Sequence, residues 1–140
     1  MYDTIVVAVD HSEQSDRAVA AAADLAKLSG GMVHLVHVKE KDLITGKGGG
    51  TYDTEDAGDA ELLLSADGQR LRDAGLSVTT EIRTVISGHV ADQIVASAEQ
   101  HSADIIVVGS HGRSGIARVV LGGTAYKVLH LADRPVLVVR

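Results

Sequence analysis

A glycine-rich segment near the end of the chain has the composition of an anion-binding loop. Residues 109–123 (GSHGRSGIARVVLGG) directly follow the apolar run 105–108 (IIVV). The glycines of this segment are Gly109, Gly112, Gly115, Gly122 and Gly123. Ordering glycine costs more backbone entropy than ordering any other residue, so such a cluster indicates a steric demand. Without Cβ atoms, backbone N–H groups could approach a phosphate closely, and a helix starting near Gly123 would add its dipole. A turn, a connecting loop and a helix cap are the alternative that spacing alone leaves open.

Asp10 is a second candidate for ligand binding. It follows the β-branched run 4–9 (TIVVAV) and precedes His11 and Ser12. A carboxylate at this position can accept hydrogen bonds from a ligand or cap the following helix. Because Ser12 competes for the cap position, we favour a ligand role for Asp10.

The histidines raise the question of a metal site. His34 and His37 are three residues apart in a predicted strand, so their side chains point to opposite faces and cannot share an ion. The histidines at or just past predicted strand ends are His11, His37, His89 and His111. They could gather around the mouth of a site, but scattered surface histidines are the simpler interpretation, and we expect no bound metal. No nucleophile stands beside an obvious base, so a dedicated enzyme is not indicated.

Alternating strands and helices must position these residues. The hydrophobic pattern predicts strands at 4–9, 32–38, 77–86, 104–108 and 135–139, and helices at 13–29, 60–74, 90–100 and 124–131. This alternation predicts one α/β domain over residues 1–140, with an open, twisted parallel sheet covered by helices on both faces. Ligands of such folds bind at the carboxyl ends of the strands, where Asp10 and Gly109 both lie. Residues 39–58 show no periodicity and predict a long mobile loop.

Two common phosphate-binding motifs are absent. No G-x-G-x-x-G follows the first predicted strand. The stretch 45–51 (TGKGGGT) resembles a P-loop, but Lys41 stands where that motif needs its first glycine and Gly48 where it needs Ser or Thr. A flexible loop is the better interpretation of this stretch.

Composition restricts the classes of partner. The net charge of −6 and the 2% of aromatic residues argue against nucleic-acid binding, which normally uses a basic face or aromatic stacking. The chain has no cysteine, so disulfides and thiolate metal sites are excluded. Neither a signal peptide nor a membrane-spanning stretch is recognisable, so we expect a cytoplasmic protein without membrane contact.

Motifs along the whole chain resemble the universal stress protein family. They are AVDHS at 8–12, HV at 37–38, GSHG at 109–112 within the pattern G-x2-G-x9-G, and RPVLVV at 134–139. The resemblance implies a Rossmann-like fold with five strands in the order 3-2-1-4-5 and, in one subclass, an ATP site. It implies that Asp10 and Val38 hold the ribose and the adenine, and that the glycine segment follows the phosphates. The implied nucleotide-binding residues are Ala8, Val9, Asp10, Val38, Val108, Gly109, His111, Gly112, Arg113, Gly122, Gly123, Thr124 and Ala125.

One position departs from the family pattern. The family has Ser or Thr directly after the last glycine of the motif, and this chain has Gly123. Thr124 could supply the hydroxyl only if ten residues separated the glycines. The loss of one hydrogen bond weakens binding by roughly tenfold or less, so the site is expected to be weakened rather than abolished.

These observations favour an ATP-binding universal stress protein that uses ATP, with Mg²⁺, to regulate an unidentified signalling partner. A dimeric stress or scaffold protein of the same fold with an empty pocket is one alternative, and a slow ATPase is another. We also expect a homodimer through Val136–Val139, a short apolar strand that the resemblance places at the sheet edge.

Overall fold

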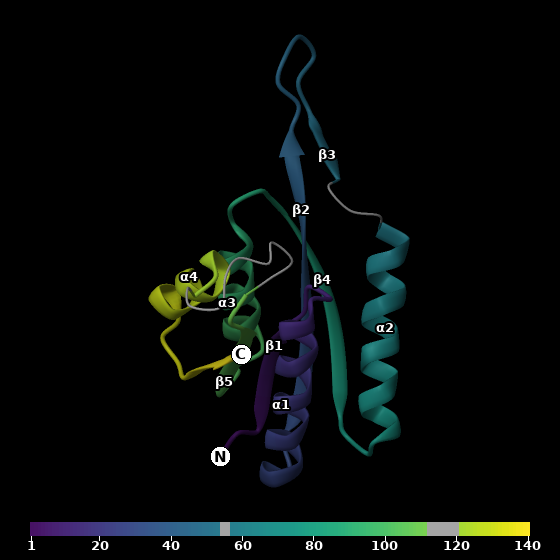
Figure 1. Ribbon diagram of the computed structural model, residues 1–140, viewed down its shortest axis with the longest axis vertical. Coiled ribbons are helices and arrows are strands. Elements are labelled where there is room, and N and C mark those ends of the chain that lie inside the picture. Colours follow the sequence, from purple (N-terminus) through teal and green to yellow (C-terminus); the bar gives the residue numbers. More distant parts are fainter. Residues whose placement is uncertain (54–56, 112–120) are drawn as a thin grey trace.

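Helices and strands alternate along the chain in the order that the sequence predicts. The computed structural model describes residues 1–53, 57–111 and 121–140. Its elements are β1 (Thr4–Ala8), α1 (Glu13–Ser29), β2 (Met32–Leu43), β3 (Thr51–Asp53), α2 (Ala57–Asp73), β4 (Val78–Ile86), α3 (Val90–Gln100), β5 (Ile105–Gly109), α4 (Gly123–Leu131) and β6 (Val136–Val139) (Figure 1). Within these described ranges, no helix is both long enough and apolar enough to cross a bilayer.

The sheet has the predicted parallel order and one additional strand. The parallel strands lie in the order β4-β2-β1-β5-β6, which is the expected order 3-2-1-4-5 counted along the chain. β1 lies at the centre, where Ile5 pairs with Val33 of β2 on one side and with Ile105 of β5 on the other. The sheet is mixed rather than wholly parallel, because β3 pairs antiparallel with the end of β2.

The prediction of a loop over residues 39–58 was wrong. β2 continues to Leu43, which pairs with Thr51 of β3, and the intervening glycines lie in the turn of this hairpin. The hairpin projects beyond the rest of the sheet (Figure 1). β2 extends because β4 pairs with it as far as Lys41, so backbone hydrogen bonds hold a segment that has no apolar periodicity. α2 likewise begins inside the predicted loop, at Ala57.

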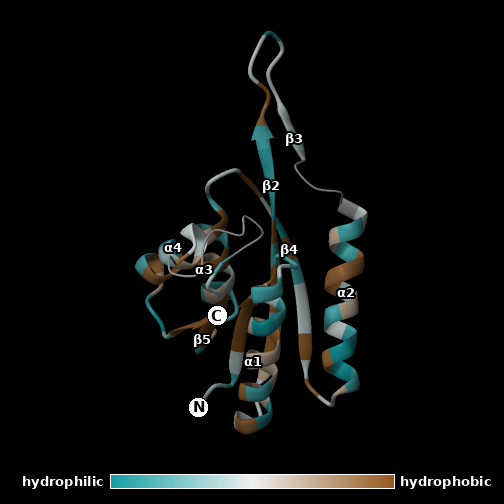
Figure 2. Cartoon of the chain, viewed as in Figure 1, coloured by the Kyte–Doolittle hydropathy of each residue, from teal (hydrophilic) through white to brown (hydrophobic). Residues whose placement is uncertain are grey.

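Two apolar layers bury both faces of the central strands. α1 and α2 pack against one face of the sheet, where Ile5 and Val7 are buried. α3 and α4 pack against the other face, where Val6 is buried. The uninterrupted apolar run of β1 follows from this double coverage, because every side chain of the strand faces a helix layer. Figure 2 shows the hydrophobic colour concentrated in β1 and β5.

The first helix begins and ends at the predicted residues. The Ser12 side chain accepts a hydrogen bond from the Ser15 N–H at 3.1 Å, which makes Ser12 the N-cap of α1. Gly30 ends the helix in the left-handed conformation, with φ of 74°. The cap is therefore Ser12 and not Asp10.

Contact with α1 explains the glycine at the end of β5. A Cβ atom on Gly109 would lie 2.9 Å from Gln14 Cβ and 3.0 Å from the Gln14 carbonyl carbon. Gly122 is also crowded, since its Cβ would lie 3.0 Å from the Ser110 carbonyl oxygen. Gly123 has open space around the Cβ position. Close approach of protein backbone therefore accounts for two glycines of the motif and leaves Gly123 without a packing role.

Replacement of Gly109 by Ala should destabilise the fold. The added methyl group would force α1 away from β5, and overpacking of this kind costs about 1–3 kcal/mol. Urea unfolding followed by circular dichroism measures the change in the free energy of unfolding. Gly123→Ala is the matched control, because its methyl group meets no atom within 4 Å and should leave stability unchanged or higher. Equal stability of the two variants would show that α1 does not impose glycine at position 109.

Candidate functional site

A cavity of about 450 Å³ lies at the carboxyl ends of β1, β2 and β5, against the first turn of α4. Every predicted site residue that the structure describes lines it. These residues are Ala8, Val9, Asp10, Val38, Val108, Gly109, His111, Gly122, Gly123, Thr124 and Ala125. Gly112 and Arg113 lie outside the described residues. The fold thus brings together segments that are about a hundred positions apart in the sequence.

The cavity also has walls that the sequence analysis missed. The additional lining residues are Ser15, Val36, Glu40, Asp42, Ser87, Val90, Ile94 and Ser110, together with His37, which the sequence placed at a strand end without a ligand role. Glu40 and Asp42 belong to the part of β2 that was predicted as a loop. Ser87 directly follows a predicted strand, so its place at a strand end was the one signal that could have identified it.

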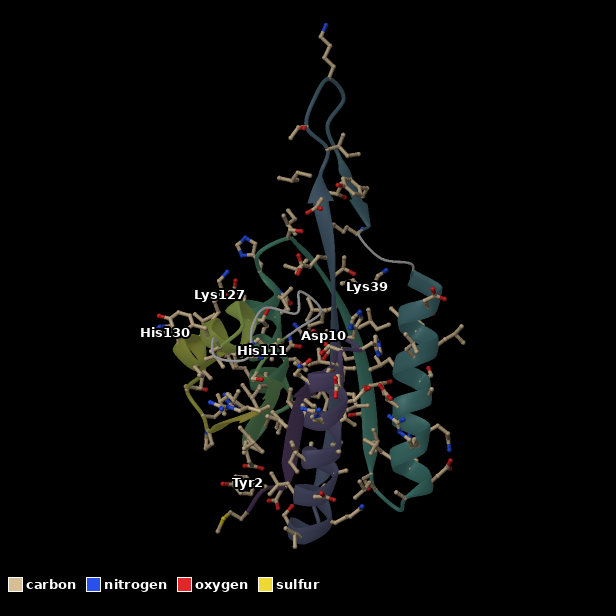
Figure 3. All side chains as sticks on the ribbon, viewed as in Figure 1. Tyr2, Asp10, Lys39, His111, Lys127 and His130 are labelled. Atoms are coloured by element: carbon tan, nitrogen blue, oxygen red, sulfur yellow. The ribbon has the colours of Figure 1, made fainter. Side chains whose placement is uncertain are left out.

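Asp10 is held at the end of β1 by the residues that begin α1. Its Oδ1 accepts hydrogen bonds from the Ser12 backbone N–H at 3.0 Å and from the Ser12 hydroxyl at 2.5 Å. The Asp10 backbone N–H donates to Ser15 Oγ at 3.1 Å. These contacts orient the carboxylate beside the cavity, on the same side of the molecule as His111 (Figure 3). The arrangement suits an acceptor for ligand hydroxyl groups.

Strand-end histidines gather at the cavity only in part. His37 lines it, and its Nδ1 lies 2.5 Å from the Val9 carbonyl oxygen. The ring of His11 lies 5.2 Å from that of His37, between centroids. His111 also lines the cavity, whereas His89 is exposed beside Asp92 and does not.

An acidic side chain of α2, Asp67, lies close to His11. His11 Nδ1 is 3.8 Å from Asp67 Oδ2. Burial raises the pKa of Asp67, although the charges of Arg70 and His11 oppose the rise. His11 itself has a φ of 62°, an uncommon conformation for a residue with a side chain.

Backbone amides at the start of α4 form one wall of the cavity. Gly122 is the N-cap, with φ of −60° and ψ of 153°, and no side chain caps the helix. The first hydrogen bond within the helix runs from Tyr126 N–H to the Gly122 carbonyl at 2.9 Å. The N–H groups of Gly123, Thr124 and Ala125 therefore have no partner within the helix, and the helix dipole gives them partial positive charge. This wall can receive an anionic group.

Acidic and apolar side chains form the other walls. The carboxylates of Asp10, Glu40 and Asp42 line the cavity, and Asp42 Oδ1 accepts a hydrogen bond from the Ser87 hydroxyl. Branched apolar side chains line it from the sheet and from α3. They are Val36, Val38, Val90, Ile94 and Val108. Within the described part of the chain, no Lys or Arg lines the cavity. An elongated ligand with an apolar ring, hydroxyl groups and an anionic end fits these walls.

Known proteins are similar to this chain in both sequence and fold. Universal stress protein YxiE of Bacillus subtilis is 31% identical over 149 residues, which cover all of both chains. A universal stress protein of Archaeoglobus fulgidus in complex with dAMP superimposes with a TM-score of 0.73 at 28% identity, over 99% of this chain and 98% of that one. A universal stress protein in complex with cAMP superimposes with a TM-score of 0.68 at 28% identity, over 99% and 97% of the two chains.

The match to the family extends along the whole sequence. The sequence model of the universal stress protein family matches residues 1–140. The strand order and the place of the cavity agree with the expectations drawn from the motifs. The chain therefore belongs to the universal stress protein family.

Proposed function

We propose that this protein binds ATP in the cavity, together with Mg²⁺, and acts in the cytoplasm as a nucleotide-dependent regulator. The observation that carries the proposal is the first turn of α4, whose backbone amides have no partner within the helix and form one wall of a cavity lined elsewhere by apolar, acidic and other polar side chains. Two solved relatives hold the adenine nucleotides dAMP and cAMP. They support a nucleotide as the ligand, and the family motif G-x2-G-x9-G favours ATP among the nucleotides.

The sheet end of the cavity suits a nucleoside. Val38 and the other apolar residues that line the cavity offer an apolar surface for adenine. The Asp10 carboxylate, oriented by Ser12, is an acceptor for the ribose hydroxyls. These roles are the ones that the family resemblance implies for the two positions.

The α4 end suits the phosphates. The amides of Gly123, Thr124 and Ala125 are donors for phosphate oxygens. The cavity already contains three carboxylates, so a polyphosphate needs a cation to reduce the repulsion. The oxygen ligands of Asp10, Glu40 and Asp42 are of the kind that Mg²⁺ prefers.

Identification of bound nucleotide tests the proposal directly. Protein purified without added nucleotide is denatured, and the released small molecules are analysed by mass spectrometry. Co-purifying ATP, or a saturable isothermal titration with ATP and Mg²⁺, supports a nucleotide-dependent regulator. The absence of both would leave the scaffold function with an empty pocket. Release of ADP over hours of incubation with ATP would identify a slow ATPase.

A hydroxyl at position 123 should strengthen ATP binding. Gly123→Ser adds a hydroxyl side chain of the kind that the family pattern has at this position. The side chain would stand at the first residue of α4, in open space. Since one hydrogen bond contributes about 0.5–1.5 kcal/mol, the affinity for ATP should rise by up to roughly tenfold. ADP should gain less, because the hydroxyl addresses the terminal phosphate. Isothermal titration with both nucleotides measures the difference.

A carboxylate at the same position should have the opposite effect. Gly123→Glu places a negative charge beside the phosphates but suits a helix N-terminus, so the fold should remain stable. We expect at least tenfold weaker ATP binding, with adenosine binding much less affected. Gly123→Ala is the control for the added Cβ atom. If the Ser and Glu variants bind ATP as the wild type does, the start of α4 does not hold the phosphates.

We also propose that two copies of the chain pair through β6. In the described part of the chain, β6 pairs with β5 alone, so its other edge is open. The Pro135 carbonyl accepts a hydrogen bond from the Ile106 N–H of β5 at 3.0 Å, and the Val139 carbonyl accepts one at 2.7 Å from the N–H of Ser110, which follows β5. Because alternate residues face opposite neighbours in a parallel ladder, the backbone polar groups of Val136 and Val138 point to the open edge. A second copy of this strand would satisfy them.

A charge on β6 should separate the dimer. Leu137→Lys places like charges next to each other when two strands pair, and Leu137 is 38% exposed, so the fold should tolerate the change. Leu62→Lys on α2, where the leucine is 70% exposed, is the matched control and should remain dimeric. Light scattering at micromolar concentration gives the two masses. A monomeric wild type, or a dimeric Leu137→Lys variant, would exclude this interface.

A further inference from the structure

A group of two histidines and a carboxylate lies away from the cavity. His34 is on β2, Glu81 is on β4, and His101 follows the last residue of α3. None of the three lines the cavity. The cavity and this group lie at opposite ends of α3. Val90, the first residue of the helix, lines the cavity, His101 follows its last residue, and the 11 residues of the helix span about 16 Å.

The potential ligand atoms of this group are already close together. His34 Nε2 lies 2.9 Å from Glu81 Oε2, and the rings of His34 and His101 are stacked with centroids 3.7 Å apart. One ligand atom from each residue can be chosen so that all lie within 4.8 Å of one another. Donor atoms around a tetrahedral zinc ion are about 3.4 Å apart. Because the two rings are stacked, His101 must turn out of the stack before both Nε2 lone pairs can point at one ion, and its exposed position leaves space for this rotation.

Hydrogen bonds engage Nδ1 of both imidazoles and leave Nε2 as the nitrogen for a metal. His101 Nδ1 lies 2.8 Å from the Ser97 carbonyl oxygen, which can only accept, so Nδ1 carries the proton and Nε2 has the lone pair. His34 Nδ1 lies 2.6 Å from the Thr79 hydroxyl. This hydroxyl can turn to accept from Nδ1, which leaves His34 Nε2 unprotonated when a cation replaces its proton. Such partners on the second nitrogen are typical of histidine ligands.

Glu81 is oriented toward the imidazoles by its own partners. Its Oε2 accepts a hydrogen bond from the Ser97 hydroxyl at 2.7 Å, while its Oε1 lies 2.7 Å from Arg83 Nε. The oxygen on the imidazole side is therefore available to a cation, and the opposite oxygen keeps the arginine. Ser97 contacts both Glu81 and His101, so one residue of α3 holds two of the ligands.

We propose that His34, Glu81 and His101 bind a divalent zinc ion, with water as the fourth ligand. Two imidazoles and one carboxylate are ligands that zinc accepts, and the exposed side of His101 leaves the fourth position open to solvent. The ion would tie the end of α3 to β2 and β4. It would therefore stabilise the layer that also supplies Val90 and Ile94 to the cavity.

Zinc titration of the full-length, nucleotide-free protein tests this site. Protein stripped with a chelator is titrated with zinc chloride in a calorimeter, and its thermal unfolding is recorded with and without zinc. We expect one zinc ion per chain at this site and a higher midpoint of unfolding. His101→Ala should bind zinc at least tenfold more weakly and lose the rise in midpoint. His89→Ala removes another exposed histidine with a carboxylate neighbour, and it should behave as the wild type does.

A second variant separates ligation from packing. Glu81→Gln keeps the size of the side chain and one acceptor oxygen for Ser97 but removes the charge, so it should fold and bind zinc at least tenfold more weakly. Cobalt(II) serves as a spectroscopic probe, and the visible absorption of a site with histidine ligands should appear in the wild type and be lost in both variants. Equal zinc binding by the wild type and His101→Ala, or no binding by the wild type, would overturn the proposal.

Discussion

The pairing of β1 with a parallel strand on each side is the constraint on which the rest of the structure depends. Because its neighbours run parallel to it, the chain must return through crossover connections before each next strand. The helices of these crossovers cover both faces of the central strand. All its parallel neighbours then end at the same edge. The cavity, with Asp10 and Gly109 on its rim, is a consequence of that geometry.

Glycine in this protein serves packing and ligand access at different positions. Gly109 is required where α1 crosses the end of β5, because a Cβ atom would meet Gln14. A Cβ atom added at Gly123 would meet no atom within 4 Å, so core packing does not require glycine at this position, which lines the cavity. Helix packing therefore explains part of the motif that resembles a phosphate-binding loop. A match to such a motif is weaker evidence for ligand binding when backbone contacts account for some of its glycines.

α3 connects two regions of different chemistry. Its N-terminal residues Val90 and Ile94 contribute apolar surface to the cavity, and Ser97 contacts the carboxylate and the histidine of the other group. Each turn of the helix that faces the sheet therefore has a distinct role. The apolar turns bury Val6 and Val36, and the last turn meets the polar face of β4, an edge strand whose residues Glu81 and Arg83 are partly exposed.

By itself the local pattern of the sequence predicted the succession of strands and helices, the bounds of α1, and the place of Asp10 and Gly109 at the carboxyl ends of strands, because parallel strands end at one edge of a sheet. The strand order and the other predicted site residues came from the family resemblance, and the site residues remain a prediction. Only the tertiary structure decided the extension of β2 to Leu43, because pairing with β4 as far as Lys41 and with β3 from Lys41 to Leu43 holds a segment without apolar periodicity. It also decided the group of His34, Glu81 and His101. The sequence allowed histidines to be grouped only by their position within one strand or at strand ends. This group is formed across β2, β4 and the end of α3, and contacts between elements leave no fixed spacing in the sequence.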